Sequence, residues 1–219
     1  MLLVLHADAA QAPAPPDPPP VEILRTIQRA YRDSPGLVAR FSQVVTSGSL
    51  PTPQREEGTL YLKPPGKMRW EYSRPKGKLA ITDGEKATLY LPEDRAVLMG
   101  PVKDLEGSAL TARLLGGTAS LEEEFRVEAQ RSSGDARLWV LRLSPRTADF
   151  PYDSVTVEAS REGWIQSIRL LDPLGNRIEY RFERIRSDKN LPEKLFRFDI
   201  PRGVEIQTFG GKAGAPASP

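Results

Sequence analysis

KPPGKMRWEYSRPKGKLAITDGEKATLYLPE, residues 63–93, is the stretch that decides the fold. Met68, Trp70 and Tyr72 alternate with charged or small side chains, and this alternation puts every second side chain on one face of an extended strand. The same pattern recurs in KLAIT and in TLYL. An arginine-proline pair and an aspartate-glycine pair separate the three segments as turn signals. The stretch therefore predicts three consecutive strands, each with one apolar face.

Similar alternation continues on both sides of this stretch. It predicts strands at LVARFSQVV (37–45), GTLYLK (58–63), RAVLMG (95–100), RLWVLRLSP (137–145), DSVTVEAS (153–160), GWIQSIRLLD (163–172) and NRIEYRFERI (176–185), and a last extended piece at LFRFDIPRGVEIQ (195–207). The count is about ten or eleven strands, joined by turn-forming residues. Antiparallel meanders of this length curl into a barrel or half-barrel, because a flat sheet leaves exposed edges.

Three helices interrupt the strand pattern. VEILRTIQRAY (21–31) carries Ile23, Leu24 and Ile27 at helical spacing, SALTARLLGG (108–117) places Leu110 and Leu114 one turn apart, and SLEEEF (120–125) begins with a capping box. The inner face of the curled sheet is the only large surface that could bury their apolar stripes. We predict a mainly β fold with some α: an incomplete, open antiparallel β-barrel with a lid of about three helices.

Length and composition favour one domain. The 219 residues suffice for a single all-β core, and the 31 basic and 29 acidic residues nearly cancel. Residues 1–20 are interpreted as a signal remnant followed by a proline-rich spacer that neither packs nor forms helix, residues 21–209 as the folded domain, and residues 210–219 as a disordered tail. MLLVLHADAAQA resembles the end of a secretory signal; a simple disordered N-terminus is the alternative.

The sequence offers little reactive chemistry. It has no cysteine, and its single histidine, His6, lies near the N-terminus. Histidine, the usual general base and metal ligand, and a cysteine nucleophile are therefore missing from the predicted domain, and we expect no enzyme, no metal and no cofactor. Tyr61, Tyr90 and other aromatic residues lie near basic ones, a pattern known from nucleic-acid stacking. The balanced charge argues for cross-strand packing and against a nucleic-acid partner.

Apolar side chains gather on one predicted face of the sheet. The strand pattern projects to that side Leu60, Leu62, Met68, Trp70, Leu79, Ile81, Leu89, Leu91, Val97 and Met99. Two interpretations remain open at this point: a close-packed core, or the wall of a cavity that holds an apolar ligand under the helices.

The same stretch, residues 63–93, resembles the signature of the LolA family. That signature has a basic residue and a proline, an aromatic-tryptophan strand, a proline turn, an apolar strand, an Asp-Gly pair and a further strand. FSQVV (41–45) is similar to the family's Phe-x-Gln strand, and FRFDIPRGVEI (196–206) resembles its C-terminal part. The similarity runs in order over about residues 21–207.

The resemblance implies a periplasmic carrier of outer-membrane lipoproteins. Such a protein accepts triacylated lipoproteins from an inner-membrane ATP-driven (ABC-type) transporter and delivers them to the outer membrane or to an acceptor there. It implies an apolar cavity closed by a helical lid, and export by an N-terminal signal that looks truncated in this chain. The expected acyl-chain wall is Leu60, Leu62, Met68, Trp70, Leu79, Ile81, Leu89 and Leu91, and the expected lid residues are Ile23, Leu24, Ile27, Leu110 and Leu114.

Two alternatives share this fold. One is a lipid- or lipoprotein-sensing regulatory module, which normally carries a further domain. The other is the outer-membrane acceptor, which is itself a lipoprotein, and the lack of cysteine argues against it. The chain also departs from the family at Pro64, where an arginine thought to hold the lid is common. Lys63 and Arg69 are neighbouring substitutes, although strand parity favours neither.

Overall fold

The computed structural model describes residues 16–104, 108–116, 121–147 and 150–210. The predicted signal remnant, the tail and the first residue of the capping box lie outside these ranges. Within them the chain forms twelve strands, and their bounds are β1 (Leu37–Thr46), β2 (Gln54–Lys63), β3 (Lys67–Arg74), β4 (Leu79–Asp83), β5 (Lys86–Leu91), β6 (Ala96–Pro101), β7 (Phe125–Arg131), β8 (Leu138–Pro145), β9 (Ser154–Ser160), β10 (Ile165–Leu171), β11 (Arg177–Ser187) and β12 (Glu205–Thr208).

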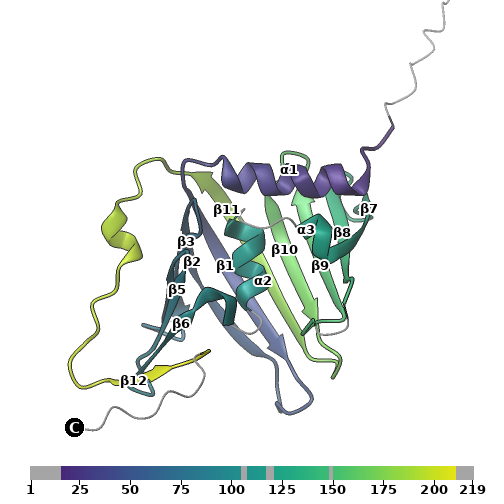
Figure 1. Cartoon of the computed structure of the whole chain (residues 1–219). Helices are drawn as coiled ribbons and strands as arrows, with labels where there is room; N and C mark the ends of the chain where they lie inside the picture. Colours follow the sequence, from purple (N-terminus) through teal and green to yellow (C-terminus); the bar gives the residue numbers. More distant parts are fainter. Residues whose placement is uncertain (1–15, 105–107, 117–120, 148–149, 211–219) are drawn as a thin grey trace, which may run out of the picture.

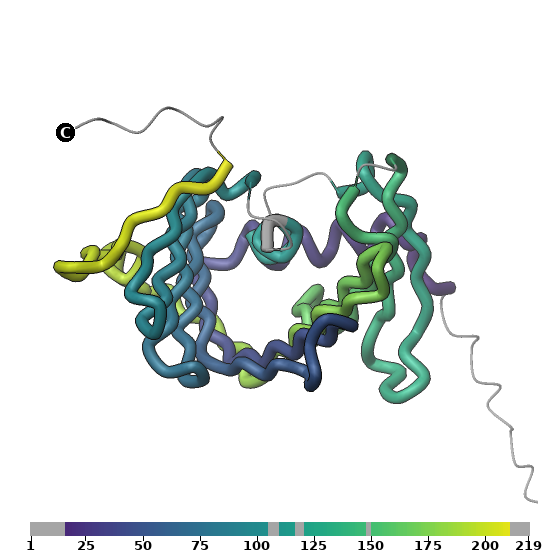
Figure 2. The backbone as a smooth tube through the Cα atoms, turned by 90° about the horizontal axis from the view of Figure 1, so that it is seen from below, coloured from purple at the N-terminus to yellow at the C-terminus, as the bar shows by residue number. Residues whose placement is uncertain are grey.

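All twelve strands belong to one sheet. Its order is β12-β6-β5-β4-β3-β2-β1-β11-β10-β9-β8-β7, and each neighbouring pair is antiparallel except β12, which runs parallel to β6. In the order of the described strands, β7 and β12 stand at opposite ends and do not pair with each other. The sheet curls into a trough, seen along its length in Figure 2. The predicted incomplete barrel is confirmed, with two differences: the parallel β12, and β7, which the sequence analysis did not assign as a strand.

The helices lie on the concave side of the trough. α1 (Pro20–Arg32) runs across one end, and α2 (Ser108–Gly116) lies in the mouth between the two halves of the sheet (Figures 1 and 2). α3 (Leu121–Glu124) is a single turn that leads into β7. No helix within the described ranges has both the length and the apolar character that crossing a membrane requires.

The end of the proline-rich segment is more ordered than the sequence suggested. Pro20 is the first residue of α1, a position where proline fits because the missing N–H would have no helical partner. Asp17 pairs with Arg131 on β7, and the Arg131 guanidinium lies 4.8 Å from the centre of the Trp139 ring. The prediction that this segment cannot pack or form helix is therefore wrong at its C-terminal end.

Two apolar layers cover the two faces of the sheet. The main core fills the trough and joins residues of α1 and α2 to the inner faces of β1–β3 and β7–β11. A smaller cluster lies on the outer face. There Leu191 and Phe196 of the segment between β11 and β12 (188–204), called the C-terminal segment below, pack on Val38 of β1. That segment includes a short 3-10 helix, η2 (Glu193–Phe196), which contacts β3 and β4. Beyond it the Phe198 ring packs at a tilt on Tyr90, with 5.3 Å between the ring centres.

Candidate binding site

Strand register defines the concave face. Residues paired across neighbouring strands share a face, because side chains alternate strictly along each strand. One row across the trough is Leu37, Leu62, Met68, Thr82 and Ala87, and the next is Ala39, Leu60, Trp70, Ala80 and Leu89. Leu91 lies two residues beyond Leu89 and so projects to the same side. Six of the eight predicted wall residues are thus brought together.

Leu79 and Ile81 do not belong to this face. Leu79 pairs with Glu71 and Ile81 with Arg69, so both side chains project to the outer side, as do Val97 and Met99 further along. The sequence prediction for these residues is wrong because the outer face of β4 is itself covered by the C-terminal segment. The alternation of Leu79 and Ile81 with their neighbours therefore marks a second buried layer on the outer face of the sheet. Hydrophobicity alone does not say which of the two layers faces the trough.

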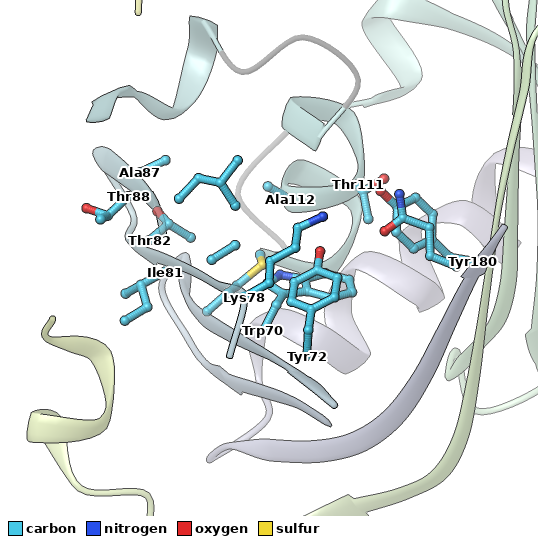
Figure 3. Close-up of a pocket in the computed structure, with 14 residues that line it drawn as sticks. Trp70, Tyr72, Lys78, Ile81, Thr82, Ala87, Thr88, Thr111, Ala112 and Tyr180 are labelled. Carbon is cyan, nitrogen blue, oxygen red and sulfur yellow. The ribbon is translucent and has the colours of Figure 1, made fainter. Parts of the chain in front are cut away.

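A pocket of about 160 Å³ lies between α2 and the half of the trough formed by β3–β5 (Figure 3). Three predicted wall residues, Met68, Trp70 and Leu89, line it together with Gln43, Tyr72, Lys78, Ala80, Thr82, Ala87, Thr88, Thr111, Ala112 and Tyr180. Ile81 borders it, but its side chain points away from Trp70 and Tyr72 in Figure 3, as the register requires. Leu60 and Leu62 lie in the packed core and do not line the pocket.

Aromatic rings form much of the wall. Trp70 meets Phe41 edge to face at 4.8 Å between ring centres, and it lies 5.8 Å from Tyr180. Phe41 also meets Tyr72 edge to face at 5.0 Å. Such pairs add about 0.5–1.5 kcal/mol each beyond the area they bury. These ring contacts therefore join the inner faces of β1, β3 and β11 into one aromatic wall.

The predicted lid residues are all buried in the main core. Ile23, Leu24 and Ile27 come from α1, and Leu110 and Leu114 from α2. The contacts of α1 reach β7 and β8, whereas those of α2 reach β2 and β3. The two helices therefore cover different parts of the trough.

α1 is fixed to the sheet by close, directional contacts. The hydroxyl of Tyr31 accepts a hydrogen bond from the backbone N–H of Ile165 at 3.2 Å, and burial raises the pKa of this phenol. Gly163, with φ +95°, lets the helix approach so closely that a Cβ there would lie 2.7 Å from the carbonyl oxygen of Thr26. Only glycine meets both the conformational and the spatial demand.

The pocket also holds polar groups that the sequence analysis did not single out. The Nζ of Lys78 lies 2.6 Å from a Glu56 carboxylate oxygen and 4.4 Å from the centre of the Tyr72 ring. Burial raises the pKa of Tyr72, so this phenol stays neutral. Gln43, Thr82, Thr88, Thr111 and Tyr180 complete the polar part of the lining. Gln43 shares the inward face of β1 with Ala39 and Phe41, and its position two residues after Phe41 in the predicted strand 37–45 was the signal that could have found it.

The comparisons with known proteins agree with this architecture. A family model described as "Outer membrane lipoprotein carrier protein LolA" matches residues 32–199. The chain belongs to the LolA family. An outer-membrane lipoprotein carrier protein of Dechloromonas aromatica is 32% identical over 170 residues, covering 78% of this chain and 80% of the relative. One of Pseudomonas fluorescens is 28% identical over 187 residues, covering 85% and 88%.

Among solved structures, an uncharacterized conserved protein from Thermus thermophilus is similar to this LolA chain with a TM-score of 0.53. Its sequence identity is 13%, and the match covers 85% of this chain and 97% of that one. At this identity the similarity shows the fold alone.

The neighbours of Pro64 do not hold the lid of this LolA chain. Lys63 donates to the carbonyl of Leu191 at 3.1 Å, and Arg69 to that of Leu195 at 3.0 Å, so both bind the C-terminal segment on the outer face. Among the described residues, side-chain ion pairs between lid helices join Arg25 to Glu122, at 3.4 Å, and Arg113 to Glu124. The lid is thus held by apolar burial, by ion pairs between its helices and, at α1, by the hydrogen bond from Ile165 to Tyr31.

Proposed function

We propose that this chain carries outer-membrane lipoproteins by holding their acyl chains in the trough under α2. It would take triacylated lipoproteins from an inner-membrane ABC-type transporter, cross the periplasm, and deliver them to the outer membrane or to an acceptor there. The observation that carries the proposal is the pocket between α2 and β3–β5, whose lining is largely apolar, in a chain of the LolA family. The carrier unit is the single domain of residues 21–209, exported by the segment before it.

Physical chemistry explains why such a carrier is needed. Each buried methylene is worth about 0.8 kcal/mol, so exposing one chain of roughly 16 carbons to water costs on the order of 12 kcal/mol. Unassisted crossing of an aqueous compartment is therefore negligible. A carrier must replace the bilayer with an apolar wall that binds the acyl chains through non-directional contacts. Binding that is too tight would prevent release of the lipid.

In this structure the pocket is too small for the acyl chains of a lipoprotein. Its volume of about 160 Å³ lies below the roughly 300 Å³ at which ligand sites begin. Acyl chains therefore enter only when something withdraws from the trough. α2 is the element that separates the pocket from the mouth, and its buried Leu110 and Leu114 occupy apolar space that a chain would take over.

Displacement of α2 determines which residues form the wall of the cavity in the loaded state. Met68, Trp70 and Leu89 line the pocket already. α2 contacts β2 and β3, so its withdrawal would add Leu60 and Leu62 to the wall, with Leu91 at the strand end. Leu79 and Ile81 take no part, because they lie in the outer layer. The task is binding and release without covalent chemistry, and no observation favours a sensing role over it.

Retention of a triacylated lipopeptide tests the proposal. The protein is mixed with a synthetic triacylated cysteine lipopeptide and separated by size exclusion, with the same peptide lacking acyl chains as the control. We expect co-elution of the acylated form only. Failure of the acylated form to co-elute, or equal retention of both peptides, would refute the carrier function.

A further inference from the structure

A polar residue interrupts the apolar row on the concave face of β1. The inward side chains of β1 run Leu37, Ala39, Phe41, Gln43 and Val45, moving away from the end covered by α1. Gln43 pairs with Tyr180 on one side and with Glu56 on the other. The pocket therefore has a polar end at the level of Gln43, Thr111 and Tyr180, away from α1, and Val45 with Ile178 continues the apolar face beyond it.

Two polar atoms at this end are buried without a partner. The Oε1 of Gln43 and the Oγ1 of Thr111 are shielded from solvent and find no hydrogen-bond partner within the described part of the chain. Thr111 is only 2% exposed, and it projects from α2 on the side of Tyr180 (Figure 3). Both residues line the same pocket. Buried polar groups are nearly always satisfied, so an orphaned pair in one pocket points to a ligand that supplies the missing partners.

The charge in the pocket selects a neutral ligand. Lys78 is the one charged side chain among the described lining residues, and it is already matched by Glu56 at 2.6 Å. Both side chains are only 17% exposed, and the ammonium group also lies over the Tyr72 ring. A free carboxylate or a phosphate would compete with Glu56 for Lys78. Ester and amide groups, by contrast, need only hydrogen bonds.

We infer that this polar cluster, Gln43 with Thr111, binds the amide and ester linkages that join the acyl chains to the N-terminal cysteine of a lipoprotein. The inference rests on the proposed carrier function. The hydroxyl of Thr111 donates to an ester carbonyl, and Oε1 of Gln43 accepts the N–H of the N-acyl amide. The acyl chains then extend toward α1, and the peptide leaves from the polar end. The cluster thus fixes the orientation of the lipid, which apolar contacts alone cannot do.

Matched ligands separate linkage recognition from apolar binding. A triacylated cysteine lipopeptide is compared with an analogue whose two glyceryl chains are attached by ethers, which keeps the hydrocarbon and removes the ester carbonyls. The parent is expected to prefer the ester form by about fivefold to tenfold, the worth of one buried hydrogen bond. The isosteric Thr111→Val variant is expected to reduce this preference to less than about twofold. Thr156→Val, which makes the same change on β9 next to Arg142 and Arg169, should keep the parent's preference.

Gln43 is tested by the same design. Gln43→Met is expected to weaken the lipopeptide about fivefold and to leave unchanged the binding of an analogue methylated at the N-acyl amide nitrogen. The inference is overturned if the parent binds ester and ether forms equally, or if each variant retains the parent's preferences. In both cases a parent that binds the lipopeptide leaves the carrier function standing. A parent that binds neither form removes the carrier function itself.

Discussion

The two lid helices cover the same trough in different ways. α1 sits on Gly163 at a distance that no other residue would allow, its Tyr31 is hydrogen-bonded to the sheet, and the core beneath it is closed. α2 lies over a pocket of about 160 Å³ and presents to it the unpartnered hydroxyl of Thr111. The difference teaches that α1 is bound to the sheet by specific contacts, whereas α2 covers a pocket that a ligand can occupy.

The largest effect is expected where α1 meets the sheet. Gly163→Ala should lower the free energy of unfolding by about 2–4 kcal/mol, because a Cβ there meets α1 backbone as well as the strain of a positive φ. Gly175→Ala is the matched control: its φ is +81°, and a Cβ there meets nothing within 4 Å. It should cost only about 1 kcal/mol. Urea unfolding measures both. Equal losses would mean that the close approach of α1 is unimportant.

Filling the pocket should weaken binding and spare the fold. Ala80 projects into the pocket between Trp70 and Leu89, so Ala80→Phe should weaken binding of the lipopeptide at least about tenfold. The free energy of unfolding should change by no more than about 3 kcal/mol. Ala136→Phe, in the exposed turn between β7 and β8, is the control and should bind like the parent. Fluorescence titration gives both affinities. Unchanged binding by Ala80→Phe would place the ligand elsewhere.

Tyr31→Phe sharpens the distinction between the helices. Loss of the hydroxyl leaves the N–H of Ile165 without its partner and should cost about 1–2 kcal/mol of stability. Lipopeptide affinity should stay within about twofold of the parent's, because α1 does not move in the loading step. A large gain in affinity, measured by the same titration, would show that α1 too acts as a gate.

The smallest effect concerns the C-terminal segment on the outer face. Hydrogen bonds from Lys63 and Lys67 hold the pKa of Glu193 at about 2, against its ordinary 4.5. A lowered carboxyl pKa gives stability that is present above pH 4.5 and lost as the pH falls toward 2. Glu193→Gln should remove this part of the acid sensitivity, to a small extent because the pair is exposed. Thermal melts at pH 6 and pH 3 compare the variant with the parent, and an unchanged difference between the two pH values would contradict the assignment.

Sequence patterns predicted the trough better than they predicted which layer faces it. The alternation around Met68 and Trp70 marked the inner face correctly, because their outward neighbours are polar. At Leu79 and Ile81 the same signal marked the outer layer, which exists only because residues far along the chain fold back over β4. β7 was missed although its apolar and polar residues alternate, because it directly follows the acidic turn of α3 and its first residue, Phe125, had been assigned to that helical segment.

The polar end of the site was beyond the reach of the sequence. Gln43 and Thr111 lie on different elements, and only the curl of the sheet brings β1 and α2 to one pocket. Gln43 stands out on its strand face beside Ala39 and Phe41, but nothing in the sequence links it to Thr111. Their shared lack of a partner is a property of the folded chain and becomes visible only there.

The central claim, that α2 moves on loading and α1 does not, is tested most directly by distances between spin labels. The chain contains no cysteine, so introduced cysteines are the only sites that a thiol-reactive spin label can modify. One label pair replaces Arg113 of α2 and Glu57 of β2, and the other replaces Arg29 of α1 and Arg161 beside β10. On adding triacylated lipopeptide, the Arg113–Glu57 distance should lengthen by about one helical turn, ~5 Å, while the Arg29–Arg161 distance stays the same. Lipid binding with no change in the α2 pair, or with an equal change in both pairs, would contradict the account.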